Sequence, residues 1–252
     1  MRFTSLGSGS AGNALIVEAG ATRLMLDCGF PVRETLRRLA RIGLSIEALS
    51  GIVVTHEHGD HIDGVFSLAG RFGIPLWLTH GTWRAAGKGY AGDVRFLDSH
   101  VPFAVDGIEV LPFPVPHDAR EPAQFVFSDG SRRLGVLTDT GSSTPHIEAM
   151  LSGCDALVLE CNHDAGLLAR GNYPPALKAR IAGPYGHLDN AASAALLGSL
   201  DNSRLKHIVA AHLSLKNNTP LLAVEALSHA LSCAPEWVGV ATQEDGFTWR
   251  EI

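Results

Sequence analysis

A short stretch, residues 55–61, carries three histidines and an aspartate in the order Thr-His-Glu-His-Gly-Asp-His. An apolar run typical of a buried strand precedes it, and a helical pattern follows. His56 and His58 alternate along an extended backbone and point the same way, whereas Asp60 and His61 stand at the start of the helix. Imidazole and carboxylate donors at this density suit zinc, manganese or iron better than calcium. We expect a metal site here; a solvated polar turn is the alternative.

Four other polar residues, Asp27, His117, Asp139 and His212, stand where an apolar strand has just ended. If these strands lie side by side, their ends converge at one edge of the packed sheets. Asp27 is expected to orient a metal-bound histidine or loop, with a plain surface turn as the alternative. The remaining donors make two incomplete coordination shells that share one carboxylate, a pattern typical of catalytic sites. The predicted metal ligands are His56, His58, Asp60, His61, His117, Asp139 and His212.

The rest of the chain predicts alternating strands and helices. Helices are expected over 31–44, over 62–69, from Ala191 with Asp189 as the cap, and from Pro220 with Thr219 as the cap. His80 and residues 162–183 are expected in loops. The predicted strands are 2–6, 14–18, 22–27, 52–54, 75–79, 94–97, 103–105, 108–113, 124–127, 134–137, 156–160, 207–211, 237–240 and 247–250.

Composition places the chain among globular proteins. Its 252 residues are 46% hydrophobic and 18% charged, and we expect one domain over residues 1–252. The start does not resemble a signal peptide, and no apolar run is long enough to span a bilayer. The four cysteines form no CxxC pair, so reduced thiols, a cytoplasmic location and no membrane partner are expected. No obligate protein partner is evident.

The net charge of −6 argues against a protein that coats polyanions nonspecifically. The local charge of the site is different. Two divalent cations, less Asp60, Asp139 and a hydroxide, leave about one positive charge. Such a site should attract an anionic, phosphate-like group, and two metals held close can clamp an attacking hydroxide and a leaving oxygen.

The chain resembles the metallo-β-lactamase superfamily from end to end. The HxHxDH motif at 56–61 is followed by His117, Asp139 and His212 in the order of that family. Residues 6–13, 160–164, 186–190 and 212–220 resemble the YycJ/WalJ group of bacterial metallohydrolases. The resemblance implies a four-layer αββα sandwich and phosphodiester hydrolysis, with 5'-to-3' exonuclease action on DNA. Asp189 departs from the small hydroxyl residue expected there and adds negative charge near the substrate.

The resemblance also implies roles for single residues. His56, His58 and His117 would bind one metal, and Asp60, His61 and His212 the other, with Asp139 bridging; zinc is expected, with manganese as the alternative. Asp60 would also align the attacking hydroxide. His187 is similar to a histidine of ribonuclease Z and would act as a general acid or position the phosphate. Glu160 would orient it, although His187 filling the helix entrance is the alternative.

Only 48 residues separate Asp139 from His187, which leaves no room for the β-CASP insert of ribonuclease J. The long flexible arm of ribonuclease Z is also missing. Nucleic acid ends, of DNA rather than RNA, would therefore be held by local residues. The expected substrate contacts are Asn162, His163, Lys178 and Arg180, with Arg170 as a weaker candidate. The face of the first helix that carries Arg33, Arg37 and Arg41 is expected to be solvated, with a phosphate contact as the alternative.

Two other functions stay open. A small-molecule hydrolase acting on a lactone, thioester or cyclic phosphate could use the same metal core, and the acidic net charge favours it. A regulatory or redox protein is the third possibility, since this fold can also hold two irons.

Overall fold

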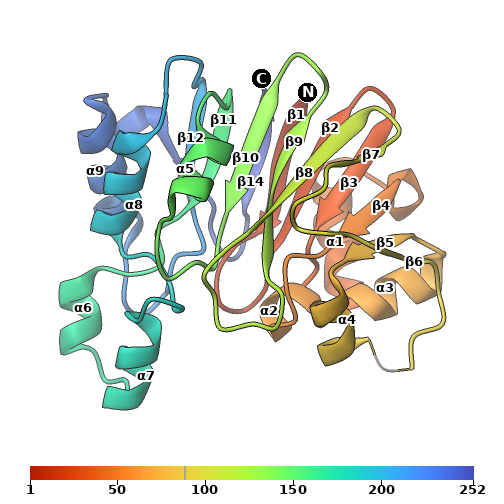
Figure 1. Ribbon diagram of the computed structural model, residues 1–252, viewed down its shortest axis with the longest axis horizontal. Coiled ribbons are helices and arrows are strands. Elements are labelled where there is room, and N and C mark those ends of the chain that lie inside the picture. Colours follow the sequence, from red (N-terminus) through yellow and green to blue (C-terminus); the bar gives the residue numbers. More distant parts are fainter. Residues whose placement is uncertain (88) are drawn as a thin grey trace.

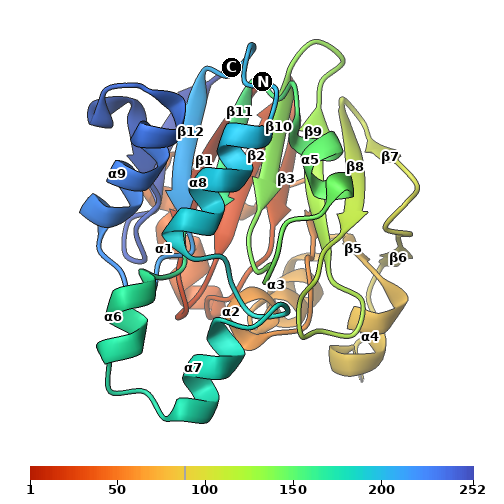
Figure 2. The same cartoon turned by 60° about the vertical axis from the view of Figure 1, so that its left-hand side comes forward.

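The computed structural model describes residues 1–87 and 89–252. Two seven-stranded sheets pack face to face, and helices cover both outer faces (Figures 1 and 2). The expected four-layer αββα sandwich is therefore confirmed, and the described residues contain no β-CASP insert. No helix among the described residues is long and apolar enough to cross a membrane.

The first sheet has the order β14-β1-β2-β3-β4-β5-β6. Strands β14, β1, β2 and β3 pair antiparallel, and β3 to β6 pair parallel. Its strands are β1 (Arg2–Gly7), β2 (Ala14–Ala19), β3 (Thr22–Leu26), β4 (Gly51–Val53), β5 (Leu76–Leu78), β6 (Val94–Phe96) and β14 (Phe247–Glu251).

The second sheet has the order β13-β12-β11-β10-β9-β8-β7. Strands β7 to β10 pair antiparallel, and β10 to β13 pair parallel. Its strands are β7 (Phe103–Val105), β8 (Ile108–Pro114), β9 (Ala123–Ser128), β10 (Arg133–Leu137), β11 (Ala156–Glu160), β12 (His207–Ala211) and β13 (Val238–Val240).

The helices lie in the connections between strands. They are α1 (Val32–Arg41), η1 (Ile46–Ala48), α2 (Gly59–Ile62), α3 (Val65–Phe72), α4 (His80–Ala86), α5 (Pro145–Leu151), α6 (Ala165–Arg170), α7 (Pro175–Ile181), α8 (Asn190–Ser199), α9 (Pro220–Leu231) and η2 (Pro235–Trp237). Asp189 and Thr219 cap α8 and α9 through their side chains, as predicted.

Three clusters of buried apolar side chains fill the spaces between the layers. The central one lies between the sheets and contains Phe3, Phe125 and Phe127. A second lies between the β7–β13 sheet and α5, α8 and α9, and a third lies between the other sheet and α1 to α3. Burial on both faces explains why the central strands are almost continuously apolar in sequence.

Several helices differ from the sequence-based expectation. His80 begins α4 rather than lying in a loop, and the expected loop 162–183 contains α6 and α7. The helix expected over 62–69 is broken into α2 and α3 at Gly64. A side chain at Gly64 would overlap the carbonyl of Phe30, so the chain can pass this point only with glycine.

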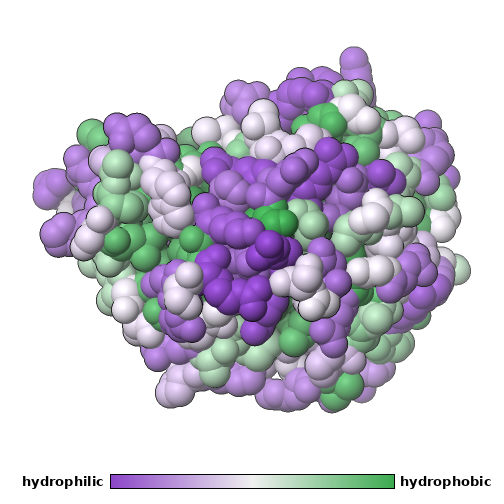
Figure 3. Space-filling model, turned by 90° about the horizontal axis from the view of Figure 1, so that it is seen from above, coloured by the Kyte–Doolittle hydropathy of each residue, from purple (hydrophilic) through white to green (hydrophobic). Residues whose placement is uncertain are grey.

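The two ends of the sandwich differ. Both chain termini lie at one end, where the surface is mostly hydrophilic with small hydrophobic patches (Figure 3). At the opposite end, near α2, lie the carboxyl ends of the parallel strands. Ligands of open sheets with parallel strands bind at such carboxyl ends, so this second end is where a functional site is expected.

Candidate metal centre

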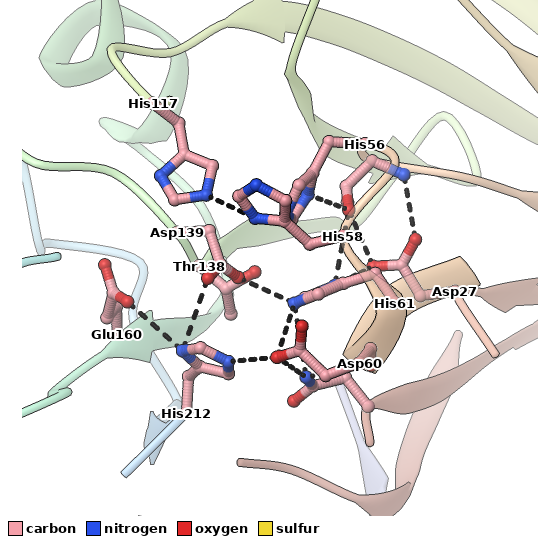
Figure 4. Close-up of polar contacts among 12 residues, drawn as sticks. Asp27, His56, His58, Asp60, His61, His117, Thr138, Asp139, Glu160 and His212 are labelled. Carbon is pink, nitrogen blue, oxygen red and sulfur yellow. Dashed lines mark hydrogen bonds and ion pairs between the residues drawn. The ribbon is translucent and has the colours of Figure 1, made fainter. Parts of the chain in front are cut away.

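Strand pairing explains how residues far apart in sequence meet. Strands β10, β11 and β12 are parallel neighbours in register, with Leu137 opposite Leu159 and Glu160 opposite Ala211. Asp139 and His212, which follow β10 and β12, therefore lie beside the end of β11. The His-rich loop comes from the facing sheet, between β4 and α2 (Figure 4).

The structure brings all seven predicted donors together. His56, His58 and His117 form one group whose ligand atoms lie within 4.8 Å of one another. Asp60, His61 and His212 form a second such group. Asp139 lies between them: its carboxylate belongs to a group with His56 and His61, and Oδ2 is 3.0 Å from Nε2 of His61. This is the position that a bridging carboxylate requires.

Hydrogen bonds on the far side of each ring determine which nitrogen faces the centre. Nδ1 of His61 donates to Oδ2 of Asp27 at 2.8 Å, and Nδ1 of His117 donates to the carbonyl of Gly186 at 3.1 Å. Since carboxylates and carbonyls only accept, these rings carry a proton on Nδ1 and present Nε2 to the centre. The hydroxyl of Thr55 donates to Oδ2 of Asp27, so it accepts from Nδ1 of His56 at 2.9 Å, and His56 also presents Nε2 to the centre.

His58 is oriented differently. Its Nδ1 lies 3.2 Å from Nε2 of His117, so Nδ1 is the inward atom of this ring. Its Nε2 lies 3.8 Å from Asp118, whose carboxylate stands at the rim of the same group. Asp118 had no assigned role in the sequence analysis.

Asp27 contacts two residues of the 55–61 stretch, Thr55 and His61. It is buried, and its carboxylate accepts hydrogen bonds from Thr55 N, Thr55 Oγ1 and His61 Nδ1, each at 2.8 Å. One side chain thus holds both the backbone and a ring of the His-rich loop. A further contact, which the sequence did not indicate, comes from Asn13. Its side-chain amide nitrogen lies 3.2 Å from Nε2 of His61.

The buried centre leaves polar atoms without partners. Nε2 of His56 has no hydrogen-bond partner, and Oδ2 of Asp139 makes no hydrogen bond although His61 is close. Burying polar groups unpaired costs free energy, so these atoms need a ligand. The donors are imidazoles and carboxylates without cysteine, three at each position with Asp139 between the two, and such a set suits divalent metal ions in a catalytic arrangement. The residues therefore fit the metals that the fold implies.

Mutual charge controls the titration of the metal-free centre. Burial alone would raise the pKa of Asp139, but His212 and His61 outweigh it and hold that pKa well below its ordinary value. Burial would lower the pKa of His212, yet Asp139 and Asp60 raise it to about 10. Burial lowers the pKa of His56 well below its usual range. Metal ions that bind here would therefore displace the protons that these residues hold in the metal-free state.

Three of these residues have strained backbones. Asp27, Asp139 and His212 adopt left-handed conformations, with φ of 60°, 51° and 56°. Each such residue costs about 1 kcal/mol or more and persists where the surrounding structure enforces it. Asp27 and His212 directly follow β3 and β12, and Asp139 lies two residues beyond the end of β10. The left-handed conformation turns each side chain toward the centre (Figure 4).

His187 and Glu160 form a pair beside the centre. Nδ1 of His187 lies 2.8 Å from Oε1 of Glu160, and the side chain is 22% exposed toward the cleft. Burial would lower the pKa of His187, but Glu160 outweighs it and raises the pKa. Glu160 also contacts Nδ1 of His212 at 3.3 Å, so it holds two histidines rather than one.

A cleft of about 360 Å³ opens over the centre. Its walls include His58, Asp60, Asp139, His187 and His212 on one side and residues of α7 on the other.

Two of the predicted substrate contacts, Arg180 and Lys178, differ in their position relative to the cleft. Arg180 lines the cleft and pairs with Asp118 at 2.5 Å, whereas Nζ of Lys178 donates to the carbonyl of Ala169 at 2.7 Å and is not among the lining residues.

The prediction that Asn162 and His163 contact substrate needs correction. Asn162 is only 5% exposed and His163 only 2%, and neither lines the cleft. The amide of Asn162 donates to the carbonyl of His212 at 3.1 Å, so it positions a candidate ligand instead. Strand-end location alone could not distinguish a side chain that faces the cleft from one that faces the core.

The arginine face of α1 is also resolved. Arg37 pairs with Glu34, and Arg41 pairs with Asp245. Arg38 is buried and donates to the carbonyls of Leu6, Gln243 and Glu244. The contacts of Arg38 and Arg41 join the helix to the loop between β13 and β14, whereas the pair of Arg37 and Glu34 lies within the helix. All of them favour a structural role over a phosphate contact.

Comparison with known proteins agrees with this geometry. The family described as "Beta-lactamase superfamily domain" matches residues 22–208. The chain is 37% identical to the exodeoxyribonuclease YycJ of Bacillus anthracis over 92% of this chain and 89% of that protein. It is 34% identical to the exodeoxyribonuclease WalJ of Streptococcus pneumoniae, over 95% and 91%.

Solved structures show the same fold at lower identity. The metallo-β-lactamase fold protein YhfI from Bacillus subtilis superposes with a TM-score of 0.77 at 15% identity, over 99% of each chain. Family match, relatives and donor set together lead to one conclusion: this chain belongs to the metallo-β-lactamase superfamily and is a metal-dependent hydrolase similar to its YycJ and WalJ members.

Proposed function

We propose that this protein is a dinuclear metal-dependent exonuclease that hydrolyses phosphodiester bonds at DNA ends in the 5'-to-3' direction. One observation carries the proposal: two groups of ligand atoms lie on either side of Asp139, which groups with one histidine of each and lines an open cleft. The names of the two exodeoxyribonuclease relatives, each matched over most of its length, support DNA as the substrate.

The two metal positions follow from the groups of donors. His56, His58 and His117 would hold one ion, and Asp60, His61 and His212 the other, with Asp139 between them. Zinc suits this nitrogen-rich donor set, and manganese is the alternative. Divalent ions bound here would polarise the phosphodiester and lower the pKa of water at the centre.

The protein's own residues would complete the chemistry. Nε2 of His187 faces the cleft because Nδ1 is held by Glu160, so His187 can donate a proton to the leaving oxygen. A raised pKa keeps that proton in place near neutral pH. Asp60, which lies at the cleft floor 3.2 Å from Nε2 of His212, would align the attacking water.

Local charge supports a phosphate-containing substrate. Two divalent ions, less the charges of Asp60 and Asp139, leave a positive centre in a protein of net charge −6. Arg180 lies at the cleft wall, paired with Asp118, and would contact the substrate backbone. Lys178 would contribute only through its charge, because it bonds away from the cleft.

A small-molecule hydrolase is the second candidate. A cleft of about 360 Å³ is large enough for a lactone, a thioester or a cyclic phosphate. The acidic net charge also favours this alternative, since nonspecific attraction to DNA is weak.

Metal-loaded protein incubated with 5'-labelled DNA tests the proposal. Release of mononucleotides from the labelled end is expected, and the His58→Ala variant should lose it while its circular dichroism spectrum is retained. Matched RNA of the same sequence measures the preference for DNA. Turnover of a lactone or of bis(p-nitrophenyl) phosphate without any cleavage of DNA would refute the nuclease and favour the second candidate.

A further inference from the structure

Arg180 and Asp118 form an ion pair in the lining of the metal cleft. Nε of Arg180 donates to Oδ2 of Asp118 at 2.5 Å, and both residues line the cleft. Arg180 lies in the last turn of α7, whereas Asp118 directly follows the candidate ligand His117. The pair therefore joins the helix that forms one wall of the cleft to the loop that carries a candidate metal ligand.

The stability of the fold does not explain this pair. The Arg180 side chain is 60% exposed and that of Asp118 is 31% exposed, and an ion pair this open to solvent contributes little to stability. Helix α7 is held by backbone contacts instead. The amide of His187 donates to the carbonyl of Ile181 at 2.9 Å. A side chain at Gly186 would overlap the carbonyls of Arg180 and Ile181. The position of the ion pair therefore points to the cleft rather than to the core.

The guanidinium keeps most of its donors free. Nε contacts Asp118, and neither Nη nitrogen of Arg180 makes a hydrogen bond with a residue that the structure describes. A guanidinium held through Nε presents its two Nη groups as a planar fork, which matches two oxygens of a phosphate. The fork lines the same cleft as the candidate metal ligands, where a substrate phosphate would bind.

Asp118 brings a negative charge to the same place. Its second oxygen, Oδ1, lies 3.8 Å from Nε2 of His58 and 3.6 Å from Nε2 of His117. A carboxylate this close to the centre repels an anionic substrate. A carboxylate in a phosphate-binding cleft must therefore provide something that outweighs this repulsion.

We propose that Asp118 is a positioning residue that holds Arg180 ready to bind phosphate. Asp118 fixes the guanidinium through Nε, and the two Nη groups bind non-bridging oxygens of the phosphate at the metal centre. Phosphate binding then does not have to immobilise a flexible arginine, because its orientation is already set. This inference rests on the phosphodiester hydrolysis of the proposed function. It concerns the phosphate alone, so it holds for DNA and for a small phosphodiester.

The sign of the Asp118→Ala effect tests the proposal. Isothermal titration calorimetry measures the affinity of the metal-loaded protein for inorganic phosphate, and variants are compared at equal metal content. Asp118→Ala should weaken phosphate binding by about 2- to 10-fold, the cost of immobilising one flexible side chain. Repulsion alone predicts the opposite, since the variant removes a negative charge from the cleft. Equal or tighter phosphate binding by Asp118→Ala would overturn the proposal.

Arg180→Gln separates positioning from charge. By itself it should weaken phosphate binding by about 10- to 150-fold, the range for one hydrogen bond to a charged group. In the Arg180→Gln background, Asp118 has no guanidinium left to position. Adding Asp118→Ala there should strengthen phosphate binding or leave it unchanged, so the two substitutions are not additive. Equal weakening by Asp118→Ala in both backgrounds would contradict the proposal.

A matched variant and a measurement without metal exclude a structural effect. Asp93 forms a comparable exposed pair with Arg95, at 3.0 Å, but it precedes β6, at the amino end of that strand. Asp93→Ala should bind phosphate as the unchanged protein does. In metal-free protein, nuclear magnetic resonance should show that Asp118→Ala shifts the Nε–H signal of Arg180 and speeds its exchange with water. An unchanged signal, or an equal loss of phosphate affinity in Asp93→Ala, would overturn the proposal.

The outcomes distinguish this inference from the proposed function. If the protein cleaves DNA but phosphate affinity is the same with and without Asp118, the positioning role fails and the nuclease stands. If no DNA is cleaved but phosphate affinity depends on the Asp118–Arg180 pair as described, the nuclease fails and the positioning role stands. If the protein turns over a lactone and binds no phosphate, both fail.

Discussion

Replacing Asp27 by asparagine should weaken metal binding at the centre without touching a metal ligand. The carboxylate accepts three hydrogen bonds, two from Thr55 and one from Nδ1 of His61. In Asp27→Asn the amide oxygen can still serve Thr55 N, but the NH₂ group then faces Nδ1 of His61. The ring must accept there, and its proton moves to Nε2, the atom that faces Asp139 at 3.0 Å.

The size of the effect follows from the lost contact. A hydrogen bond to a charged group contributes about 1.5–3 kcal/mol, which corresponds to roughly 10- to 150-fold in affinity. Removing such a supporting contact from a metal-bound histidine typically costs 10- to 100-fold. We therefore expect about 10- to 100-fold weaker binding of the ion held by His61, with a smaller effect on the ion held by His117.

Competition with a chromogenic chelator measures both binding steps on metal-free protein. Asp106→Asn is the matched control, since Asp106 is also an aspartate with positive φ, 47°, but it lies in the exposed turn between β7 and β8. The control should bind both ions as the unchanged protein does. Unaltered affinity in Asp27→Asn, or an equal loss in Asp106→Asn, would refute the reasoning.

Three further predictions concern single side chains. His187→Ala should lower kcat by about 10²- to 10⁴-fold at unchanged metal content, and an unchanged kcat would return His187 to a structural role. Arg38→Met should lower the free energy of unfolding by about 3 kcal/mol or more, because it strands buried carbonyls such as that of Leu6, whereas the exposed Arg37→Met should lose less than about 1 kcal/mol in the same urea titration. A hydrogen bond from Arg37 lowers the pKa of Glu34 from 4.5 to about 2, so the stabilisation by Glu34 is present above pH 4.5 and lost toward pH 2. The unchanged protein should therefore have a slightly larger free energy of unfolding than Glu34→Gln above pH 4.5, and the difference should vanish toward pH 2. A difference that grew on acidification would contradict this prediction.

The donors of the centre could be predicted because each stands at a strong local signal. His56, Asp139 and His212 each follow an apolar strand, and parallel strands deliver their ends to one edge. The strands themselves were predictable for the same reason, since burial on both faces makes them continuous apolar runs. The caps of α8 and α9 followed from side-chain chemistry at Asp189 and Thr219.

Other features carry no local signal. Helix α7 has only seven residues, and the apolar pair Leu177 and Ile181 is too short a repeat to indicate a helix. Arg38 has the spacing of a solvated face, yet it is buried by the loop around Gln243, which is far away in sequence. Asn162 and His163 lie near the centre, but only tertiary packing turns their side chains away from the cleft.

The central claim is that the folded chain holds two cations at one rim. Anomalous diffraction from crystals grown with zinc tests it most directly. We expect one peak among His56, His58 and His117 and a second among Asp60, His61 and His212, with Asp139 between them. Peaks elsewhere, or no peak at this rim at saturating zinc, would contradict the account.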